Sequence, residues 1–382
     1  MRHGGVAAAR RASTAIGAAV VVAALAACSA VTTIFADAAP RTAPYPVPGT
    51  DLFDWKGVVH CHSYLSHDCD GTVEEILDAC RVAGIDFVVM TDHQTDASVR
   101  DGLRGRRQRT LFVVGAEIRT PQGTIIAFPL RKPLRRWQSA GALVAEARRQ
   151  GAISFLCHAE RTKAWDTPGI AGVEIVNLHA GAVSANRAGM LAAGLFLPLR
   201  ALFQQICRRD DEVFHQWDAQ LAQRHPMTPV GGNDAHASVR IFGPLGGTIG
   251  NYREVFLTLS THVLAPSMDE EQLIAAFRAG RSYTSFDLFG DGTGFDFRAV
   301  DGNGVHLPGG TVTTAAELEL RVGTPAVGVI RLLRDGEAVQ ETTGKDLAHR
   351  APAPGVYRVE VRTRGGAPWL FSSSIRVVAP AT

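Results

Sequence analysis

Between Asp51 and about Phe286 the chain alternates short apolar runs with stretches of helical periodicity. The run 86–90 is continuously apolar after its first residue, which is typical of a parallel strand buried on both faces. Before it, Thr72 followed by Glu75 predicts a capping box at a helix start, and Gly84 predicts the helix end. The alternation indicates parallel βαβ units, and a segment of about 235 residues is the size of an α/β barrel.

Polar side chains stand inside or just after six of the predicted strands, whose apolar runs are 58–62, 86–90, 111–114, 153–157, 173–176 and 227–230. In chain order these side chains are His60 and His62, His93, Glu117, His158, Asn177 and His179, and Asp234 and His236. A single histidine at a strand end is usually an ordinary polar residue. Here the coincidence over several strands favours ligands, because the carboxyl ends of barrel strands converge on one face.

The ligand types indicate the kind of metal. Mixed imidazole and carboxylate ligation suits Zn²⁺, Mn²⁺ or Fe rather than Ca²⁺ or an iron–sulfur cluster. The candidate ligands are too many for one tetrahedral ion, so we expect two or three divalent ions.

After the predicted helix 269–279 the composition changes to short strands separated by Gly and Pro. Four runs have strand length and strand character: 318–322, 329–333, 356–361 and 374–378. Asp335-Gly336 is a hairpin signal between two strands. We therefore predict a small antiparallel β-sandwich over residues 286–382, without a ligand cluster, which packs on the barrel or binds a partner or glycan.

The N-terminus has the layout of an export signal. Arg2, Arg10 and Arg11 precede residues 12–36, a stretch of 25 residues without a charged side chain. Three outcomes stay open: a cleaved signal peptide, a lipoprotein attached through Cys28, and an uncleaved membrane anchor. With the Pro-rich linker that follows, this segment forms residues 1–50, ahead of a metal-binding barrel over 51–285. We expect an exported, extracytoplasmic protein that is attached to the membrane in two of the three cases.

Composition narrows the class of protein. The chain has 382 residues with 46% hydrophobic and 20% charged side chains, which excludes a disordered chain and a polytopic membrane protein. A net charge of +2 gives no strong signal for nucleic-acid binding. Five cysteines follow Cys28 and no CxxC pair occurs, which argues against a disulfide framework. We interpret Cys61 and Cys157 as core residues. The sequence leaves the oligomeric state open.

The order of the candidate ligands resembles the polymerase and histidinol phosphatase (PHP) superfamily of metal-dependent phosphoesterases. The resemblance covers about residues 54–285, and its motifs are His60-Cys-His62, Asp68, Thr91-Asp-His93, Glu117, His158 and Asp234-Ala-His236. It implies a distorted (β/α)7 barrel. It also implies that His60, His62, Glu117 and Asp234 hold one ion, that Glu117 bridges to a second ion bound by His158, and that Asp68, His93 and His236 hold a third.

Three positions leave alternatives within this resemblance. His67 can replace Asp68, which we favour. Thr124 stands where many trinuclear members carry a further histidine, so the site can be dinuclear. His179 is either a substitute ligand or a residue that faces the substrate.

The resemblance implies a hydrolase that uses metal-activated hydroxide on a small phosphomonoester of the nucleotide or sugar phosphate type. Asp234, Glu117 and His236 are the catalytic candidates. Arg161, Lys163 and Arg240 are candidates for binding the substrate phosphate, and Asp92 for orienting ligands. Arginines between 100 and 109 form either a recruiting surface for a nucleotide or a solvated loop. The alternatives are a metal amidohydrolase or lactonase, and a noncatalytic metal-binding module with an interaction domain.

Overall fold

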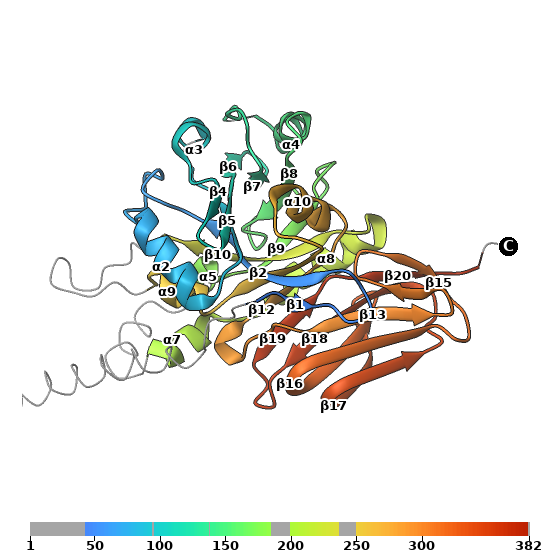
Figure 1. Cartoon of the computed structure of the whole chain (residues 1–382). Helices are drawn as coiled ribbons and strands as arrows, with labels where there is room; N and C mark the ends of the chain where they lie inside the picture. Colours follow the sequence, from blue (N-terminus) through green and yellow to red (C-terminus); the bar gives the residue numbers. More distant parts are fainter. Residues whose placement is uncertain (1–42, 94, 137, 185–198, 237–249, 381–382) are drawn as a thin grey trace, which may run out of the picture.

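The computed structural model describes residues 43–93, 95–136, 138–184, 199–236 and 250–380 (Figure 1). The predicted export signal, Cys28 and Arg240 lie outside these residues. Within them, no helix combines the length and the apolar character needed to cross a membrane.

A parallel sheet forms the centre of the N-terminal part (Figure 1). Strand β2 pairs in parallel with β3 and with β10, and the ladder continues in parallel from β3 to β5 and from β10 to β9. This agrees with the βαβ units expected from the sequence. The strands are β1 (Tyr45–Pro46), β2 (Phe53–Cys61), β3 (Phe87–Met90), β4 (Gly105–Arg107), β5 (Thr110–Val114), β6 (Ala116–Thr120), β7 (Gly123–Phe128), β8 (Ile153–Cys157), β9 (Gly172–Asn177), β10 (Thr228–Ala235), β11 (Ser260–Ala265) and β12 (Ser282–Ser285).

The predicted distorted (β/α)7 barrel is not confirmed. Strand β7 is antiparallel to both β6 and β8, and within the described part of the chain no ladder joins β5 to β7, so the sheet stays open. The physical reason lies in the connection between β6 and β7, which is a tight turn at 121–122. A parallel strand needs a crossover of about a dozen residues or more, and this turn leaves no room for one. The observed architecture is a mixed α/β fold with a large sheet.

The helices begin and end where local chemistry favours it. Thr72 and Glu75 form the predicted capping box of α2, and Gly84 ends this helix with a left-handed φ of 66°. Asp269 caps α10 by accepting a hydrogen bond from the backbone N–H of Gln272. The helices are α2 (Val73–Ala83), α3 (Thr95–Asp101), α4 (Ala140–Arg149), α5 (Leu178–Ser184), α7 (Leu199–Ile206), α8 (Asp211–Gln223), α9 (Tyr252–Phe256) and α10 (Glu270–Arg278).

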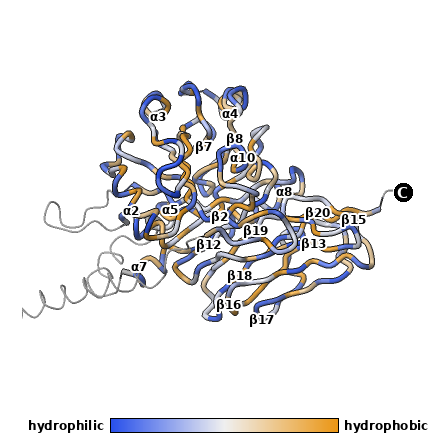
Figure 2. The backbone as a smooth tube through the Cα atoms, viewed as in Figure 1, coloured by the Kyte–Doolittle hydropathy of each residue, from blue (hydrophilic) through white to orange (hydrophobic). Residues whose placement is uncertain are grey.

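The C-terminal part consists of strands that follow a short 3₁₀ helix, η2 (Asp287–Phe289). Strand β16 pairs antiparallel with β13, β17 and β18, and the predicted turn at Asp335-Gly336 joins β16 to β17. Figure 2 shows hydrophobic and hydrophilic residues alternating along these strands. The strands are β13 (Asp296–Asp301), β14 (Gly304–His306), β15 (Thr311–Thr313), β16 (Glu319–Arg334), β17 (Glu337–Arg350), β18 (Gly355–Arg362), β19 (Pro368–Ser372) and β20 (Ile375–Val378). Their interpretation as a sandwich stays a prediction.

Strand pairing crosses the predicted domain boundary at residues 285 and 286. Strand β12 pairs antiparallel with β19, with Thr284 opposite Phe371, so one ladder runs through both parts of the chain. The buried guanidinium of Arg358 on β18 binds the carboxylate of Asp218 on α8, with both N–O distances at 2.6 Å. At the other end, Tyr45 pairs with Asp54, so backbone pairing begins before Asp51, where we expected folded chain to start.

Candidate metal centre

Three of the predicted ligands have an unusual backbone conformation. His60, His158 and Asp234 have φ values of 70°, 50° and 48°. Positive φ is uncommon in residues other than glycine, and such strained positions cluster at functional sites. The ladder of β2 also changes register around His60, and that of β10 around Asp234. These irregularities re-aim side chains at the strand ends.

The innermost group joins three segments of the sheet. The Nε2 atom of His60 lies 3.1 Å from Glu117 Oε2 and 3.2 Å from Asp234 Oδ1. The Nε2 atom of His62 lies 3.3 Å from the same Glu117 oxygen and 3.5 Å from the same Asp234 oxygen. All four residues are buried. The structure thus brings together the four residues that the resemblance assigned to one ion.

These distances fit a metal ion better than a hydrogen-bonded network. Ligand atoms about 2.1 Å from a common tetrahedral or octahedral ion lie about 3.0–3.4 Å from one another. Moreover, His62 Nε2 and Asp234 Oδ1 are buried and have no hydrogen-bond partner among the described residues. Buried polar atoms are rarely left unpaired, so both atoms point to a group that the protein binds.

The carboxylates of this group are ionised. Burial alone would raise the pKa of Glu117, but His60 and His158 outweigh it and hold the pKa well below its ordinary value. The pKa of Asp234 is likewise lowered, because His60 and His62 outweigh the effect of burial. Both carboxylates are therefore ionised at neutral pH and can bind a cation.

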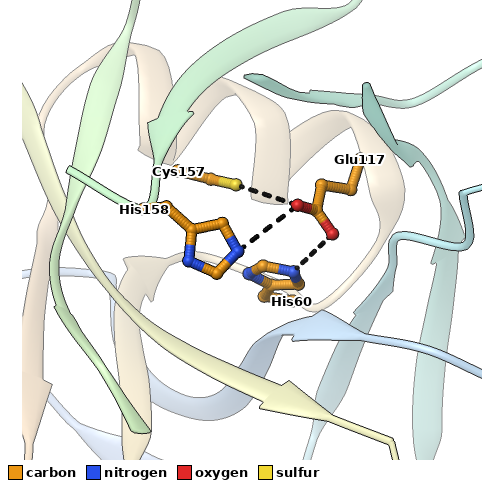
Figure 3. Close-up of side chains that lie close together, drawn as sticks. All are labelled: His60, Glu117, Cys157 and His158. Carbon is orange, nitrogen blue, oxygen red and sulfur yellow. Dashed lines mark hydrogen bonds and ion pairs between the residues drawn. The ribbon is translucent and has the colours of Figure 1, made fainter. Parts of the chain in front are cut away.

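A second group lies on the other side of Glu117 (Figure 3). Glu117 Oε2 faces His60, while Oε1 lies 3.4 Å from His158 Nε2 and 3.6 Å from Cys157 Sγ. Asp234 divides its oxygens in the same way, since its Oδ2 lies 3.6 Å from His158 Nε2. Each of the two carboxylates thus turns its two oxygens toward different candidate ligands.

Cys157 was interpreted from the sequence as a core residue, and it is fully buried. Its thiol nevertheless contacts Glu117 and can be a metal ligand. Burial, followed by the nearby carboxylates, raises the pKa of the Cys157 thiol well above its ordinary value. Its position directly before His158 was the only sequence signal for this proximity.

A third group is more exposed. His93 Nε2 lies 3.2 Å from Asp68 Oδ2, and His236 Nε2 lies 3.7 Å from the same oxygen. The imidazole of His62 stacks on that of His236, which connects this group with the innermost one. Asp68 contacts both histidines as expected. The alternate ligand His67 is largely exposed, with its Nδ1 atom 4.0 Å from Asp68 Oδ1.

His179, the other alternate ligand, lies in the first turn of α5 rather than on a strand. Its ring centroid is 5.8 Å from that of His236. The structure therefore places His179 beside the third group.

Glu174 on β9 orients two ligands, and sequence reasoning missed it. Its Oε1 accepts a hydrogen bond of 2.5 Å from His60 Nδ1, and its Oε2 accepts the backbone N–H of His158 at 3.0 Å. The amide of Asn177 also donates to Glu174 Oε2. Because a carboxylate only accepts, His60 carries a proton on Nδ1, and Nε2, which faces Glu117 and Asp234, is the atom that would bind an ion. A charged residue inside an apolar strand was the available signal.

Asp92 acts on His62 through Ser66. The Ser66 hydroxyl donates to Asp92 Oδ1 at 3.0 Å, so it accepts the proton of His62 Nδ1 at 3.1 Å. This arrangement leaves the His62 Nε2 lone pair free to bind a metal. The contacts agree with the orienting role expected for Asp92.

A cavity of about 320 Å³ opens beside Glu117 and His158. Thr124 lies in its wall, next to the ligands, where the resemblance would place a further histidine. Two arginines, Arg119 and Arg161, also line it. Arg161 was predicted. Arg119 was not, because its position depends on the β6–β7 hairpin that the sequence analysis did not foresee.

The other basic candidates, Lys163 and the arginine-rich loop, make different contacts from Arg161. Lys163 donates its backbone N–H to Gln122, but its side chain does not line this cavity. In the arginine-rich loop, Arg104 and Arg106 donate to the backbone carbonyls of Val99 and Met268, so these side chains brace the loop.

We compared the chain with known proteins. No protein-family model matches the sequence, and no curated protein matches it. Among solved structures, the chain is similar to a two-domain protein from Bacteroides vulgatus that contains a "predicted PHP-like metal-dependent phosphoesterase". The sequence identity is 15%, the TM-score is 0.44, and the match covers 88% of this chain and 100% of that one.

A second similar structure is a "putative metal-dependent phosphoesterase" from Bifidobacterium adolescentis. Here the identity is 12%, the TM-score is 0.29, and the match covers 52% of this chain and 94% of the other. These neighbours are of the kind that the sequence motifs indicated, and the His, Glu and Asp groups of this chain fit a metal site.

Proposed function

We propose that this protein is a metal-dependent phosphoesterase that hydrolyses a small phosphomonoester. The proposal is supported mainly by the orientation of the Glu117 and Asp234 carboxylates. Each carboxylate turns one oxygen toward His60 and the other toward His158. Two carboxylates that bridge neighbouring ligand groups are suited to a cluster of ions, and ions about 3.5–4 Å apart are typical of phosphoester hydrolysis.

The donor sets suit two or three divalent ions, Zn, Mn or Fe. The first would be held by His60, His62, Glu117 and Asp234, and the second by Glu117, Asp234 and His158. Asp68, His93 and His236 would hold the third. When bound, such ions lower the pKa of water toward neutrality, so that hydroxide is available to attack phosphorus, and they stabilise negative charge on the attacking and leaving oxygens.

The side chains of the chain hold the reactants in position. Arg119 and Arg161 line the cavity beside the carboxylates, where a guanidinium can bind two phosphoryl oxygens at once. His236 donates from Nδ1 to the backbone carbonyl of Asp234 at 2.9 Å. Burial, aided by the nearby charge of His62, lowers the pKa of His236 to about 4. His236 is therefore neutral at pH 7 and presents Nε2 as an acceptor.

The same proposal includes the untested expectations from the N-terminus. We infer that residues 1–50 direct export and that the enzyme meets its phosphorylated substrate outside the cytoplasm. Fractionation of cells that produce the full chain tests this, with recovery in the cytoplasmic fraction as the contradicting outcome.

The experiment for the main proposal is a turnover assay of metal-loaded protein with phosphomonoesters, phosphodiesters and amides. We expect phosphomonoester hydrolysis that is lost in Asp234→Asn and His60→Ala, with folding judged by circular dichroism. Hydrolysis of amides or lactones alone would favour an amidohydrolase. Absence of turnover with Zn²⁺, Mn²⁺ and Fe²⁺ would leave a metal-binding module.

A further inference from the structure

Cys157 and Thr124 are direct partners in the antiparallel ladder of β7 and β8. Directly opposed residues send their side chains to the same face of a sheet, with Cβ atoms about 4.5–5.5 Å apart. Thr124 stands where the resemblance would place a further histidine ligand. The thiol of Cys157 therefore projects from the same face of the sheet as that histidine would, one strand further along.

The backbone at His158 brings two consecutive residues to one site. Successive side chains of a regular strand point to opposite faces. His158 follows the last residue of β8 and has a φ of 50°, which lies outside the extended range. Because the backbone turns here, the imidazole of His158 and the thiol of Cys157 both reach Glu117 Oε1 (Figure 3).

The distances around Glu117 Oε1 match those between ligands of a common ion. With Zn–S bonds of about 2.3 Å and Zn–O bonds of about 2.1 Å, sulfur and oxygen ligands of a tetrahedral ion lie about 3.6 Å apart. Cys157 Sγ lies 3.6 Å from Glu117 Oε1, and His158 Nε2 lies 3.4 Å from it. The ligand atoms of His60, Glu117, Cys157 and His158 all lie within 4.8 Å of one another. Among the described residues, Cys157 is the only cysteine in such a group.

We infer that Cys157 is a thiolate ligand of the second ion and that this ion is Zn²⁺. The sulfur takes the place of the histidine nitrogen that Thr124 lacks. It raises the ligand set of this ion from Glu117, Asp234 and His158 to four residues, the usual coordination number of zinc. Thiolate ligands favour zinc, whereas manganese prefers oxygen ligands. The inference rests on the metal centre of the proposed function but not on its substrate.

Binding of the thiolate is balanced by the loss of one proton. The S–H bond of Cys157 breaks, the proton passes to solvent, and the sulfur donates an electron pair to the ion. Burial by itself favours the protonated thiol. A bound divalent cation reverses this preference, because a coordinating thiol is deprotonated outright.

The first measurement is the absorption spectrum of the full chain loaded with Co²⁺ in place of Zn²⁺. A thiolate bound to Co²⁺ gives an intense charge-transfer band in the near ultraviolet, which nitrogen and oxygen ligands do not give. We expect this band in the parent protein and its loss in Cys157→Ser. Cys207→Ser is the matched control and should keep the band, because the Cys207 thiol is also buried but belongs to no ligand group of the described residues.

The second measurement separates a metal ligand from a hydrogen-bond donor. The contact of Cys157 Sγ with Glu117 also allows a hydrogen bond from the thiol, and the hydroxyl of Cys157→Ser keeps such a donor. Loss of an outer partner lowers metal affinity about 10–100-fold, so loss of a ligand should lower the Zn²⁺ affinity by more than about 100-fold. The Mn²⁺ affinity should fall much less, because Mn²⁺ accepts oxygen ligands. Competition titrations measure both affinities.

A third measurement needs no variant, so it decides the question even if Cys157→Ser and Cys157→Ala do not fold. X-ray absorption at the zinc edge of the zinc-loaded parent protein should show a sulfur neighbour at about 2.3 Å. If all neighbours are nitrogen and oxygen, Cys157 is not a ligand.

The remaining outcomes separate this inference from the proposed function. A parent protein without the Co²⁺ band, or a band that persists in Cys157→Ser, refutes the thiolate ligand. Equal losses of Zn²⁺ and Mn²⁺ affinity in Cys157→Ser would show that Cys157 only positions Glu117, which also refutes it. If the parent protein shows the band and the sulfur neighbour but hydrolyses no phosphomonoester, the inference stands and the proposed function fails.

Discussion

Glu174 lies behind His60, with its Oε1 atom 2.5 Å from the Nδ1 atom of the imidazole, and neither side chain is exposed to solvent. The contact fixes the orientation of the imidazole ring and keeps a proton on Nδ1. It also links β9 to β2, and the other oxygen of Glu174 accepts the backbone N–H of His158 at the end of β8. One carboxylate thus sets the positions of two ligands that belong to different groups.

We predict that Glu174→Gln weakens metal binding without removing a ligand. The amide has one acceptor oxygen instead of two and no charge, so the His60 ring is held less firmly. Substitution of such an outer partner typically lowers metal affinity about 10–100-fold. Competition titrations with a chromogenic chelator would measure the change. Glu337→Gln, at an exposed position on β17, is the control, and equal affinities of the two variants would contradict the orienting role.

Gly232 makes room for this contact. A Cβ atom at Gly232 would overlap the carboxylate of Glu174. We therefore predict that Gly232→Ala destabilises the protein by about 1–3 kcal/mol through overpacking and also lowers metal affinity. Urea unfolding would measure the first effect and chelator competition the second.

Gly302→Ala is a suitable comparison for that substitution, because a Cβ atom at Gly302 would have no neighbour within 4 Å. If both alanine variants unfold at the same urea concentration, the packing of β10 against Glu174 is looser than the structure indicates.

The candidate ligands could be picked out from the sequence because their signal is local. His60, His62, Glu117 and Asp234 each stand inside or just after an apolar run, and the convergence of parallel strand ends supplies the rest. Glu174 could not be predicted, because its role depends on which strand lies beside β9. The same holds for Arg119, which reaches the cavity only through the β6–β7 hairpin.

Only part of the fold, like only part of the site, could be predicted from the sequence. The helix ends at Thr72 and Gly84 follow from short-range capping chemistry and were predicted. The direction of β7 was not, because the strand–helix alternation seen elsewhere was extended to a segment that contains no helix. A tight turn at 121–122 reverses the chain there, and closure of the sheet is a long-range property that local patterns do not encode.

Tyr252 on α9 connects the backbones of two ligand segments. Its hydroxyl donates to the carbonyl of His62 at 2.7 Å and lies 3.4 Å from Cys69 Sγ, which itself donates to the carbonyl of His236 at 2.7 Å. Burial, together with nearby thiols, raises the pKa of Tyr252, so the hydroxyl stays protonated and can donate. Tyr252→Phe removes this donor from the buried carbonyl of His62, and we predict a loss of about 1–3 kcal/mol of stability.

The same substitution should also loosen the group formed by His62, His93 and His236. Metal analysis after dialysis would then show fewer bound ions per chain than in the parent protein. The exposed Tyr45 provides the control variant Tyr45→Phe. Unchanged metal content and stability in Tyr252→Phe would show that the hydroxyl does not hold the ligand segments.

We predict that ion pairs at the junction of β2 with the segment after β12 make the stability of the protein depend on acidic pH. Lys56 Nζ lies 2.8 Å from Asp287 Oδ2 and 3.7 Å from Asp291 Oδ1. Burial raises the pKa of Asp291, but Lys56 and His262 outweigh it and lower the pKa from 3.8 to about 2. A lowered pKa in the folded state means that ionised Asp291 stabilises the protein above about pH 4 and that this contribution is lost as the pH falls toward about 2.

Asp291→Asn should therefore unfold at lower urea concentration than the parent protein at about pH 6, and the difference should disappear near about pH 2. Because the Asp291 side chain is 55% exposed, solvent screens the pair, and added salt should reduce the difference. Asp346→Asn, at an exposed position of β17, serves as the control, and a pH-independent difference for Asp291→Asn would refute the ionic contribution.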